Sequence, residues 1–467
     1  MNLTNLSIKQ AKIALDKKEI SSFELTKYFI ERIKKYKGLN AFITLCEKEA
    51  LDDALKADEM IKDGQNLKLL GIPIALKDIF STKGVKTTAA SKLLEDYVPI
   101  YNATVVEKLK NEGAIIIGKT NCDAWAHGSS GENSDFGPAK NPWNTSFVPG
   151  GSSSGSAVAV AADLCLGATG TDTGGSIRLP ASFCNIVGLK PTYGRVSRYG
   201  VLAMASSMDS IGHFTKTVED SALLLDITAG KDSLDATTKD EKFSNFSKDL
   251  DKDITNLKIG IPKEYFSKDL DKKVKNQIEK ALKFYESKKV KLIEISLPTT
   301  EYAIASYYII QPSEVSSNLA RYDGIRFGHD RSYFGNEAKR RIMLGTFTLS
   351  VGYYDAYYKK AMKVRTLIIK DFEKAWEKVD AIIAPVSPTL PWKLGEKTND
   401  PLKMYLSDAL TVPANLAGIP GLSIPAGFVD GLPVGMQILG PQFSESLLFR
   451  LGYSFEKENN FQREPNI

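Results

Sequence analysis

Histidine is scarce in this sequence, which holds only His127, His213 and His329 among 467 residues. These residues lie far apart, and none has the H-x-x-x-H or Cys/His spacing of a zinc site. The sequence therefore argues against a metalloenzyme built on imidazole ligands. A Ser-His-Asp hydrolase would have to choose its base from these three residues, so hydrolytic chemistry here calls for another proton acceptor.

Cysteine pairs, excess charge and long apolar runs are also missing. The four cysteines form no C-x-x-C pair, and the first ten residues lack the apolar stretch of a secretory signal. We therefore expect an unexported, cytoplasmic protein with reduced thiols. The sequence contains no run of about 18 apolar residues, so it predicts no membrane-spanning helix. A net charge of +5, from 61 basic and 56 acidic residues, argues against a surface that wraps nucleic acid.

The composition that remains predicts one large α/β domain over 1–467. Hydrophobic residues make up 43% of the chain, enough for an extensive core, and no change in composition is deep enough to mark a linker. Helical spacing of apolar residues, as in Leu25, Phe29 and Ile33, predicts an N-terminal helical segment over 1–65. A core rich in glycine and serine follows over 66–220, and 221–467 completes the domain.

Apolar runs and glycine or proline breaks predict several further elements. A βαβ pattern, with strands over 257–262 and 290–295 around a charged helix over 272–288, favours a mixed or parallel sheet. The other predicted elements are a buried strand over 70–78 that ends near Lys77, a helix over 105–112, a strand over 114–118, a helix over 157–166, a helix over 353–379 and a strand over 381–385.

A loop of glycine and serine, 149–156, comes before the helix of small residues. Free backbone N–H groups and the positive end of a helix dipole suit an anion or an oxyanion. The loop is not a phosphate loop, because no Gly-Lys-Ser/Thr follows it and no G-x-G-x-x-G is present. A tightly packed entry to the helix would have the same composition, so these residues alone leave both interpretations open.

A second stretch with little side chain is Thr173-Gly174-Gly175-Ser176. A serine after two glycines can present its Oγ on a sharp turn, with the preceding amides directed at a developing oxyanion. An ordinary β-turn explains the same residues, and for this stretch taken alone it is the better explanation.

Lys77 is surrounded in sequence by apolar residues, including Leu76, Ile79 and Phe80. A lysine at the end of a strand is usually solvated. If these neighbours desolvate Lys77, its pKa is lowered, because burial disfavours the charged ammonium. A neutral lysine can then serve as the general base that scarce histidine does not supply.

Taken together, Lys77, the loop at 149–156 and the turn at 173–176 resemble the amidase signature family, and the resemblance extends over nearly the whole chain. The family's fold is a large mixed β-sheet covered on both faces by helices. The resemblance therefore implies this α/β fold, together with the family's Ser–cis-Ser–Lys triad.

Carried over residue by residue, the resemblance implies that Ser176 is the nucleophile. Ser152, after a cis peptide bond, would be the bridging serine, and Lys77 the base. The backbone N–H groups of Thr173, Gly174 and Gly175 would hold the oxyanion.

Further motifs are similar to one branch of the family, the glutaminase subunits of tRNA-dependent amidotransferases. They lie at 321–328, 353–360, 364–366 and 410–420. This similarity implies a glutamine site made by Tyr307, Arg341, Asp408 and Ser129. A guanidinium suits an α-carboxylate, and a carboxylate suits an α-ammonium. Without the resemblance, Arg341 belongs to a basic run that could be a solvated helix face, and Asp408 could cap a helix.

The same branch implies the cofactors and partners. The chain would hydrolyse glutamine to glutamate and ammonia and would need no cofactor of its own. B and C subunits would complete a heterotrimer, in which ATP and Mg²⁺ bind one of those partners. That partner would use the ammonia to amidate mischarged Glu-tRNA(Gln) or Asp-tRNA(Asn). No contact with a membrane is expected.

The sequence departs from the family's usual pattern at a few places. Ser154 stands where a glycine is usual, Trp125 and His127 replace the more usual Phe and Met, and the segment between Arg326 and Glu337 is shorter than is common. Three other functions stay open: a stand-alone amidase with the same triad, a pyridoxal-phosphate enzyme with Lys77 as the Schiff base, and a non-catalytic scaffold subunit.

Overall fold

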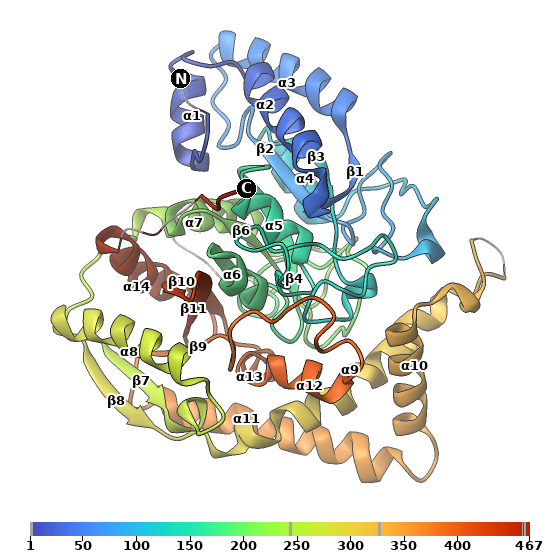
Figure 1. Ribbon diagram of the computed structural model, residues 1–467, viewed down its shortest axis with the longest axis vertical. Coiled ribbons are helices and arrows are strands. Elements are labelled where there is room, and N and C mark those ends of the chain that lie inside the picture. The colour runs from blue at the N-terminus through green and yellow to red at the C-terminus, as the bar shows by residue number, and fades with distance from the viewer. Residues whose placement is uncertain (1–2, 242–244, 326–327, 460, 462–463) are drawn as a thin grey trace.

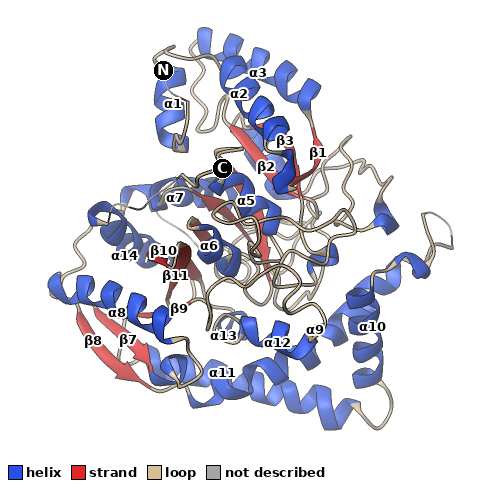
Figure 2. Cartoon of the chain, in the orientation of Figure 1, coloured by secondary structure: helices blue, strands red, loops and turns tan. Residues whose placement is uncertain are grey.

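A mixed β-sheet organises the computed structural model, which describes residues 3–241, 245–325, 328–459, 461 and 464–467. Among these residues the sheet has 11 strands in the order β1-β3-β2-β4-β6-β5-β10-β11-β9-β7-β8. Helices pack around it (Figures 1 and 2). The strands are β1 Phe42–Leu45, β2 Pro73–Lys77, β3 Ile115–Thr120, β4 Gly167–Asp172, β5 Val187–Lys190, β6 Ser210–Thr215, β7 Lys258–Pro262, β8 Lys291–Ile295, β9 Ala381–Pro385, β10 Gly421–Val429 and β11 Leu432–Leu439.

The helices vary from short turns to long amphipathic rods. None that the structure describes is both long and apolar enough to cross a membrane. The α-helices are α1 Ile8–Asp16, α2 Ser22–Lys35, α3 Glu47–Lys62, α4 Thr104–Asn111, α5 Ser154–Ala161, α6 Arg178–Cys184, α7 Val218–Thr228, α8 Lys272–Ser287, α9 Ala303–Asn318, α10 Asn336–Leu349, α11 Lys360–Trp376, α12 Pro401–Tyr405, α13 Val412–Ala417 and α14 Glu445–Glu458.

The N-terminal segment contains the predicted helices and one strand that the prediction missed. Helix α2 begins at a capping box, in which the Ser21 hydroxyl accepts from the Glu24 N–H while the Glu24 carboxylate accepts from the Ser21 N–H. Its buried face includes Leu25, Phe29 and Ile33, as the helical spacing predicted. Strand β1 was missed because its four residues are all half-buried and lack the strict alternation of a strand.

The predicted βαβ unit is confirmed, since β7 and β8 pair in parallel and α8 lies between them in the chain. The predicted strand over 381–385 is β9, which pairs in parallel with β7. The predicted helix over 157–166 lies three residues too late at its start and five too late at its end, because α5 runs from Ser154 to Ala161. The helix predicted over 353–379 becomes a π-helical turn, Tyr354–Lys359, followed by α11.

Strands β2 and β4 set the place of the site. They pair in parallel, with Ala75 opposite Ala168, so both end at the same edge of the sheet. The Lys77 N–H at the end of β2 donates to the Thr169 hydroxyl on β4, at 3.0 Å. The strand predicted to end near Lys77 therefore ends there, and it delivers this lysine to the neighbourhood of Asp172 at the end of β4.

Candidate active site

The Lys77 side chain is completely buried and ends among hydroxyl groups. Its Nζ donates to Ser152 Oγ at 2.8 Å, to Ser153 Oγ at 3.0 Å and to Thr171 Oγ1 at 2.8 Å. None of the ion pairs between described residues includes Lys77. Burial lowers the pKa of Lys77 to about 8, because it disfavours the charged ammonium more than the nearby acidic side chains, Asp123, Asp209 and Asp172 among them, favour it.

Two other buried lysines show how unusual these partners are. Lys119 forms an ion pair with Asp78 at 3.6 Å, and Lys190 Nζ donates to the carbonyl oxygens of Pro191 and Ile419. A carbonyl can only accept, whereas a hydroxyl accepts one proton and passes on another. Lys119 Nζ also donates to the Thr87 hydroxyl at 2.6 Å, beside its ion pair and a carbonyl. Of these three amines, only that of Lys77 donates to hydroxyls alone.

Ser152 follows a cis peptide bond, as the resemblance implied. Its carbonyl oxygen accepts from the Asp123 N–H at 3.1 Å. The Asp123 carboxylate in turn accepts from the N–H groups of Gly131 and Asn133. A Cβ on Gly151 would lie 2.0 Å from Asp123 Oδ2, so only glycine fits beside it. Asp123 thus positions the serine loop, and the sequence analysis did not identify it.

The Ser154 departure has a local explanation. A Cβ on Gly131 would lie 2.6 Å from the Ser154 Cβ, so the serine fits because the residue facing it has no side chain. At a second departure, Trp125 packs against the rings of Tyr322 and Phe334. The short segment after Arg326 lies partly outside the described residues.

Ser176 lies beside the serine loop, since its carbonyl oxygen accepts from the Ser153 N–H at 3.2 Å. Its side chain makes no hydrogen bond to a described residue, and a bond between Ser176 Oγ and Ser152 Oγ is not made in this structure. The two predicted serines are therefore neighbours, and the Ser176 hydroxyl is unconstrained.

The turn before Ser176 leaves its amides available. The Gly174 carbonyl accepts from Thr411 Oγ1 at 2.6 Å, which fixes the orientation of the peptide. Gly175 has a φ of +141°, and a Cβ there would lie 2.3 Å from Thr411 Oγ1. Among the described residues, the N–H groups of Gly174, Gly175 and Ser176 have no acceptor. These amides can stabilise an oxyanion at Ser176.

Thr173, at the start of the turn, is held by its side chain. Its hydroxyl donates to Asp209 Oδ1 at 2.6 Å, and the same carboxylate accepts from the N–H groups of Met204 and Ala205. Thr171 and Asp209 help to line a cavity of about 200 Å³. The cavity therefore borders one of the three hydroxyls that contact Lys77.

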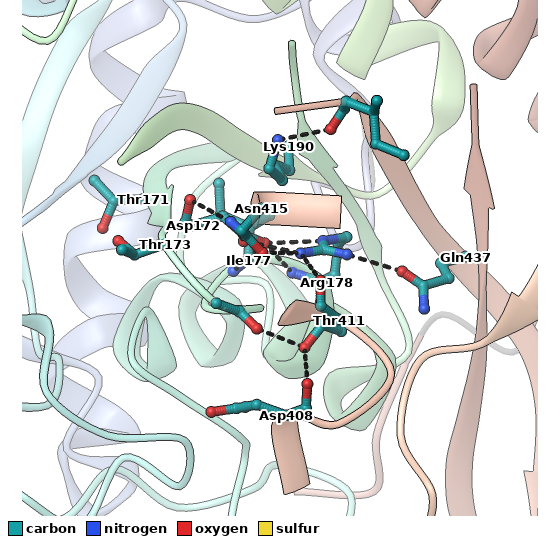
Figure 3. Close-up of polar contacts among 12 residues, drawn as sticks. Thr171, Asp172, Thr173, Ile177, Arg178, Lys190, Asp408, Thr411, Asn415 and Gln437 are labelled. Carbon is teal, nitrogen blue, oxygen red and sulfur yellow. Dashed lines mark hydrogen bonds and ion pairs between the residues drawn. The ribbon is translucent and has the colours of Figure 1, made fainter. Parts of the chain in front are cut away.

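A buried ion pair fixes both ends of the turn (Figure 3). Asp172, at the end of β4, pairs with Arg178, at the start of α6, and neither side chain is exposed. Asp172 Oδ2 also accepts from the N–H groups of Ile177 and Arg178, and Asn415 Nδ2 donates to Oδ1. Burial alone would raise the pKa of Asp172, but Arg178 outweighs it and holds the pKa at about 2.

The predicted substrate residues include a pair joined by a hydrogen bond and a tyrosine that lies against the turn. Ser129 Oγ donates to Asp408 Oδ2 at 2.6 Å. A Cβ on Gly174 would lie 2.8 Å from the Tyr307 hydroxyl, which places this phenol directly against the turn. Burial raises the pKa of Asp408 to about 7, although the Ser129 hydrogen bond opposes this effect. Asp408 therefore contacts Ser129, and the interpretation that it caps a helix is wrong.

Arg341 is buried, unlike its neighbours Lys339 and Arg340, so its interpretation as part of a solvated helix face is wrong. Its Nε donates to Glu337 Oε1 at 2.8 Å, one turn earlier on α10. Neither terminal nitrogen of Arg341 donates to a described residue. Glu337 was not predicted, although the i, i+4 spacing of opposite charges was visible. The two terminal guanidinium nitrogens of Arg341 are thus available to bind an anionic ligand.

Comparison with known families identifies the class of protein that this site belongs to. The Amidase family model matches residues 24–449. The chain therefore belongs to the amidase family, as its sequence pattern implied.

Full-length relatives place it more narrowly. The chain is 53% identical to the glutamyl-tRNA(Gln) amidotransferase A subunit of Caldanaerobacter subterraneus subsp. tengcongensis, over 100% of this chain and 99% of that protein. The chain is also similar to the glutamyl-tRNA(Gln) amidotransferase A subunit of Thermotoga maritima, whose crystal structure is known. The two sequences are 40% identical and the structures align with a TM-score of 0.86, over 100% of this chain and 99% of that chain. The peptide amidase of Stenotrophomonas maltophilia is 28% identical, with a TM-score of 0.85 over 100% and 99% of the two chains. Within the amidases, the chain groups with the glutamyl-tRNA(Gln) amidotransferase A subunits.

Replacing Arg178 tests the support of the turn. In Arg178→Met, the Asp172 carboxylate stays buried without its guanidinium, and we expect the free energy of unfolding to fall by about 3–5 kcal/mol. Urea unfolding followed by circular dichroism measures the loss. The double variant Asp172→Asn/Arg178→Met carries no unpaired charge and should recover part of it. A loss below about 1 kcal/mol for the single variant would contradict the role of the pair.

Proposed function

We propose that this chain is the glutamine-hydrolysing subunit of a tRNA-dependent amidotransferase, with Lys77, Ser152 and Ser176 as its catalytic triad. The observation that carries the proposal is the Lys77 amine, which is fully buried and bonded to hydroxyls beside a turn with free amides. The full-length similarity to amidotransferase A subunits supports glutamine as the substrate.

The first half of the reaction forms an acyl-enzyme. Neutral Lys77 accepts the proton of Ser152 Oγ, and Ser152 accepts that of Ser176 Oγ after rotation about the Ser176 side-chain torsion. Ser176 Oγ attacks the side-chain carbonyl carbon of glutamine. Backbone N–H groups of the Thr173–Ser176 turn, among them the unpaired amides of Gly174 and Gly175, stabilise the oxyanion. Losing one such donor typically costs about 3–4 kcal/mol in the barrier.

The second half releases glutamate. Ser152 donates a proton to the leaving nitrogen and recovers one from Lys77, so ammonia departs and a glutamyl ester remains on Ser176. Water then adds to the ester carbonyl, and one of its protons is transferred to Ser152 while Ser152 transfers its own proton to Lys77. Collapse of this second tetrahedral intermediate returns the proton to Ser176 Oγ and frees glutamate.

The charged ends of glutamine match the residues around the turn. The two free terminal nitrogens of Arg341 suit a bidentate bond to the α-carboxylate. Asp408 suits the α-ammonium, whose positive charge would lower the pKa of Asp408 again and keep it ionised. Ser129 holds the Asp408 carboxylate, and Tyr307 closes the space above Gly174.

The same observations bear on the other functions. A stand-alone amidase of neutral carboxamides would have no use for the buried fork of Arg341. A pyridoxal-phosphate enzyme needs a lysine with room for an aldehyde, whereas three hydroxyls enclose the Lys77 amine. A non-catalytic scaffold leaves the contact between the Lys77 amine and the Ser152 hydroxyl without a purpose.

We further propose that the ammonia serves a partner protein. In a heterotrimer with B and C subunits, that partner would bind ATP and Mg²⁺ and amidate mischarged Glu-tRNA(Gln), or Asp-tRNA(Asn), in the cytoplasm. This chain itself would need no cofactor.

An exposed apolar hairpin tip supports an assembly with other subunits. The turn from α10 through the π-helical segment to α11 lies at the edge of the molecule (Figure 1). Exposed apolar side chains gather on it, and Lys360 and Lys363 flank them with positive charge. Such a patch is typical of a protein–protein interface. We propose that it binds an apolar, acid-rimmed surface of a partner protein. The exposed apolar residues are Met343, Leu344, Phe347, Leu349, Val351, Tyr353, Tyr354 and Tyr357.

The first test concerns the base. Because only neutral Lys77 can accept a proton, kcat/KM for glutamine should rise with pH around the Lys77 pKa of about 8 and level off above it. Well below that pKa, the rate should fall about tenfold per pH unit. Ammonia release measured from about pH 6.5 to about pH 9 gives the profile. A flat profile, or one that Lys77→Ala leaves unchanged, would contradict the assignment.

The second test concerns the nucleophile. Ser176→Ala should lower glutamine hydrolysis by about a thousandfold or more, because no other hydroxyl is placed to form the ester. In the assembled amidotransferase the same variant should still amidate Glu-tRNA(Gln) when ammonium chloride replaces glutamine, which serves as the internal control. Near wild-type glutaminase activity in Ser176→Ala would contradict the assignment of Ser176 as the nucleophile.

The third test concerns the partner surface. Val351 is 99% exposed, so Val351→Asp should leave the fold and the glutaminase activity of the lone chain intact. Its affinity for the co-expressed B and C subunits should fall about tenfold or more, since a carboxylate replaces an apolar contact. Sedimentation of the purified mixture measures the affinity. Ile100→Asp, at another site that is 85% exposed, is the matched control. Equal affinities for Val351→Asp and the wild type would rule out this surface.

A further inference from the structure

His127 is a buried side chain without a hydrogen-bond partner. Its exposed fraction is 1%, and neither ring nitrogen contacts a polar atom of a described residue. The other two histidines are satisfied, because His213 Nε2 bonds with Ser221 Oγ at 2.9 Å and His329 lies 3.4 Å from Glu95. A buried imidazole with both nitrogens unpaired is uncommon in proteins and leaves hydrogen-bond capacity for a further group.

The backbone holds His127 firmly next to the substrate residues. Trp125 and Ala126 both have left-handed backbone conformations, with φ of +59° and +62°. The His127 N–H donates to the Ala124 carbonyl, and Asn133 Nδ2 donates to the His127 carbonyl at 2.7 Å. Two residues later, Ser129 bonds to Asp408. The turn therefore fixes the backbone of His127 two residues from Ser129, and strained backbone of this kind is concentrated at functional sites.

The charge around His127 decides its protonation. Burial lowers the pKa of His127 well below its usual value, and the positive charge of Arg341 lowers it further. The ring is therefore neutral, with one N–H donor and one bare nitrogen. Arg341 is close enough to act on the ring, and its own charge is partly balanced by Glu337 at 2.8 Å. An anion held by Arg341 would meet a second, neutral donor in His127.

We propose that His127 determines substrate specificity by donating its ring N–H to the α-carboxylate that Arg341 binds. This inference rests on the proposed function, since it assigns the contact to glutamine. It adds a donor that the other residues do not supply, because Ser129 and Asp408 serve the α-ammonium. It also accounts for a polar side chain at a place where the family pattern more often has methionine.

The kinetic test uses His127→Met, which the fold should accept because methionine is usual in the family at this position. A contact made equally with substrate and transition state changes KM and leaves kcat alone. We expect KM for glutamine to rise about tenfold, as for a lost hydrogen bond to a charged group, with kcat within about twofold of wild type. His127→Gln keeps an N–H donor and should recover part of the loss. An unchanged KM in His127→Met would overturn the proposal.

A second substrate separates this contact from a general loosening of the pocket. In L-glutamine α-amide the carboxylate is replaced by a neutral carboxamide, so the wild type should prefer glutamine strongly. In His127→Met this preference should shrink about tenfold, because the lost donor served the carboxylate. A preference equal to that of the wild type would assign His127 a packing role only. His213→Met, which also places methionine at a buried histidine, is the matched control and should keep both KM and the preference.

Ring NMR of the three histidines tests the contact even if His127→Met fails to fold. The His213→Met and His329→Met variants assign the signals. Saturating Ser176→Ala with glutamine should shift the His127 ring signal and leave the other two in place. A shift confined to the other histidines, or none while glutamine binds by calorimetry, would overturn the inference. If the wild-type chain neither binds nor hydrolyses glutamine, the proposed function itself fails.

Discussion

The burial of the Lys77 amine among hydroxyls, without an ion-pair partner among the described residues, is the constraint on which the rest of the site depends. An ammonium in the interior is costly unless an opposite charge compensates it. Lys119 has Asp78 as its ion-pair partner, although burial still lowers the pKa of Lys119. Lys77 has Ser152, Ser153 and Thr171 instead, and burial lowers its pKa to about 8, so the neutral amine becomes available at mildly basic pH. A neutral amine bonded to serine is what a proton relay without imidazole requires.

Around this amine, charge is used to hold geometry. Asp172 and Arg178 are both fully buried, and such pairs contribute little net stability compared with apolar side chains of the same volume. Their hydrogen bonds connect β4, α6 and α13, three segments that meet at the turn before Ser176. Asp123 does the same for the serine loop, and Asp209 for Thr173. Three acidic residues thus keep the backbone of the site in place, and none of them needs to touch a substrate.

The candidate catalytic residues leave weak marks in the local sequence, and their proposed roles came from the resemblance to the amidase signature family. Lys77 stood out among apolar residues, and the two Gly/Ser stretches stood out for their lack of charge. The supporting residues could not be found in this way. An isolated Asp172, Asp123 or Glu337 looks like any acidic residue until its partner is known. The α5 boundary and strand β1 were also misplaced, because small residues and short half-buried stretches give a weak periodic signal.

The sequence by itself determined the α/β class and the βαβ unit of β7, α8 and β8, and its family resemblance supplied the candidate groups for the chemistry. These depend on the order of apolar and small residues, which is a local property of the chain. Only the tertiary structure decided that Lys77 has no ion-pair partner among the described residues, that Arg341 is buried with a free fork and that His127 has no partner. Protonation and unpaired hydrogen-bond capacity depend on burial and on groups brought in from distant segments, and no local pattern of residues records either.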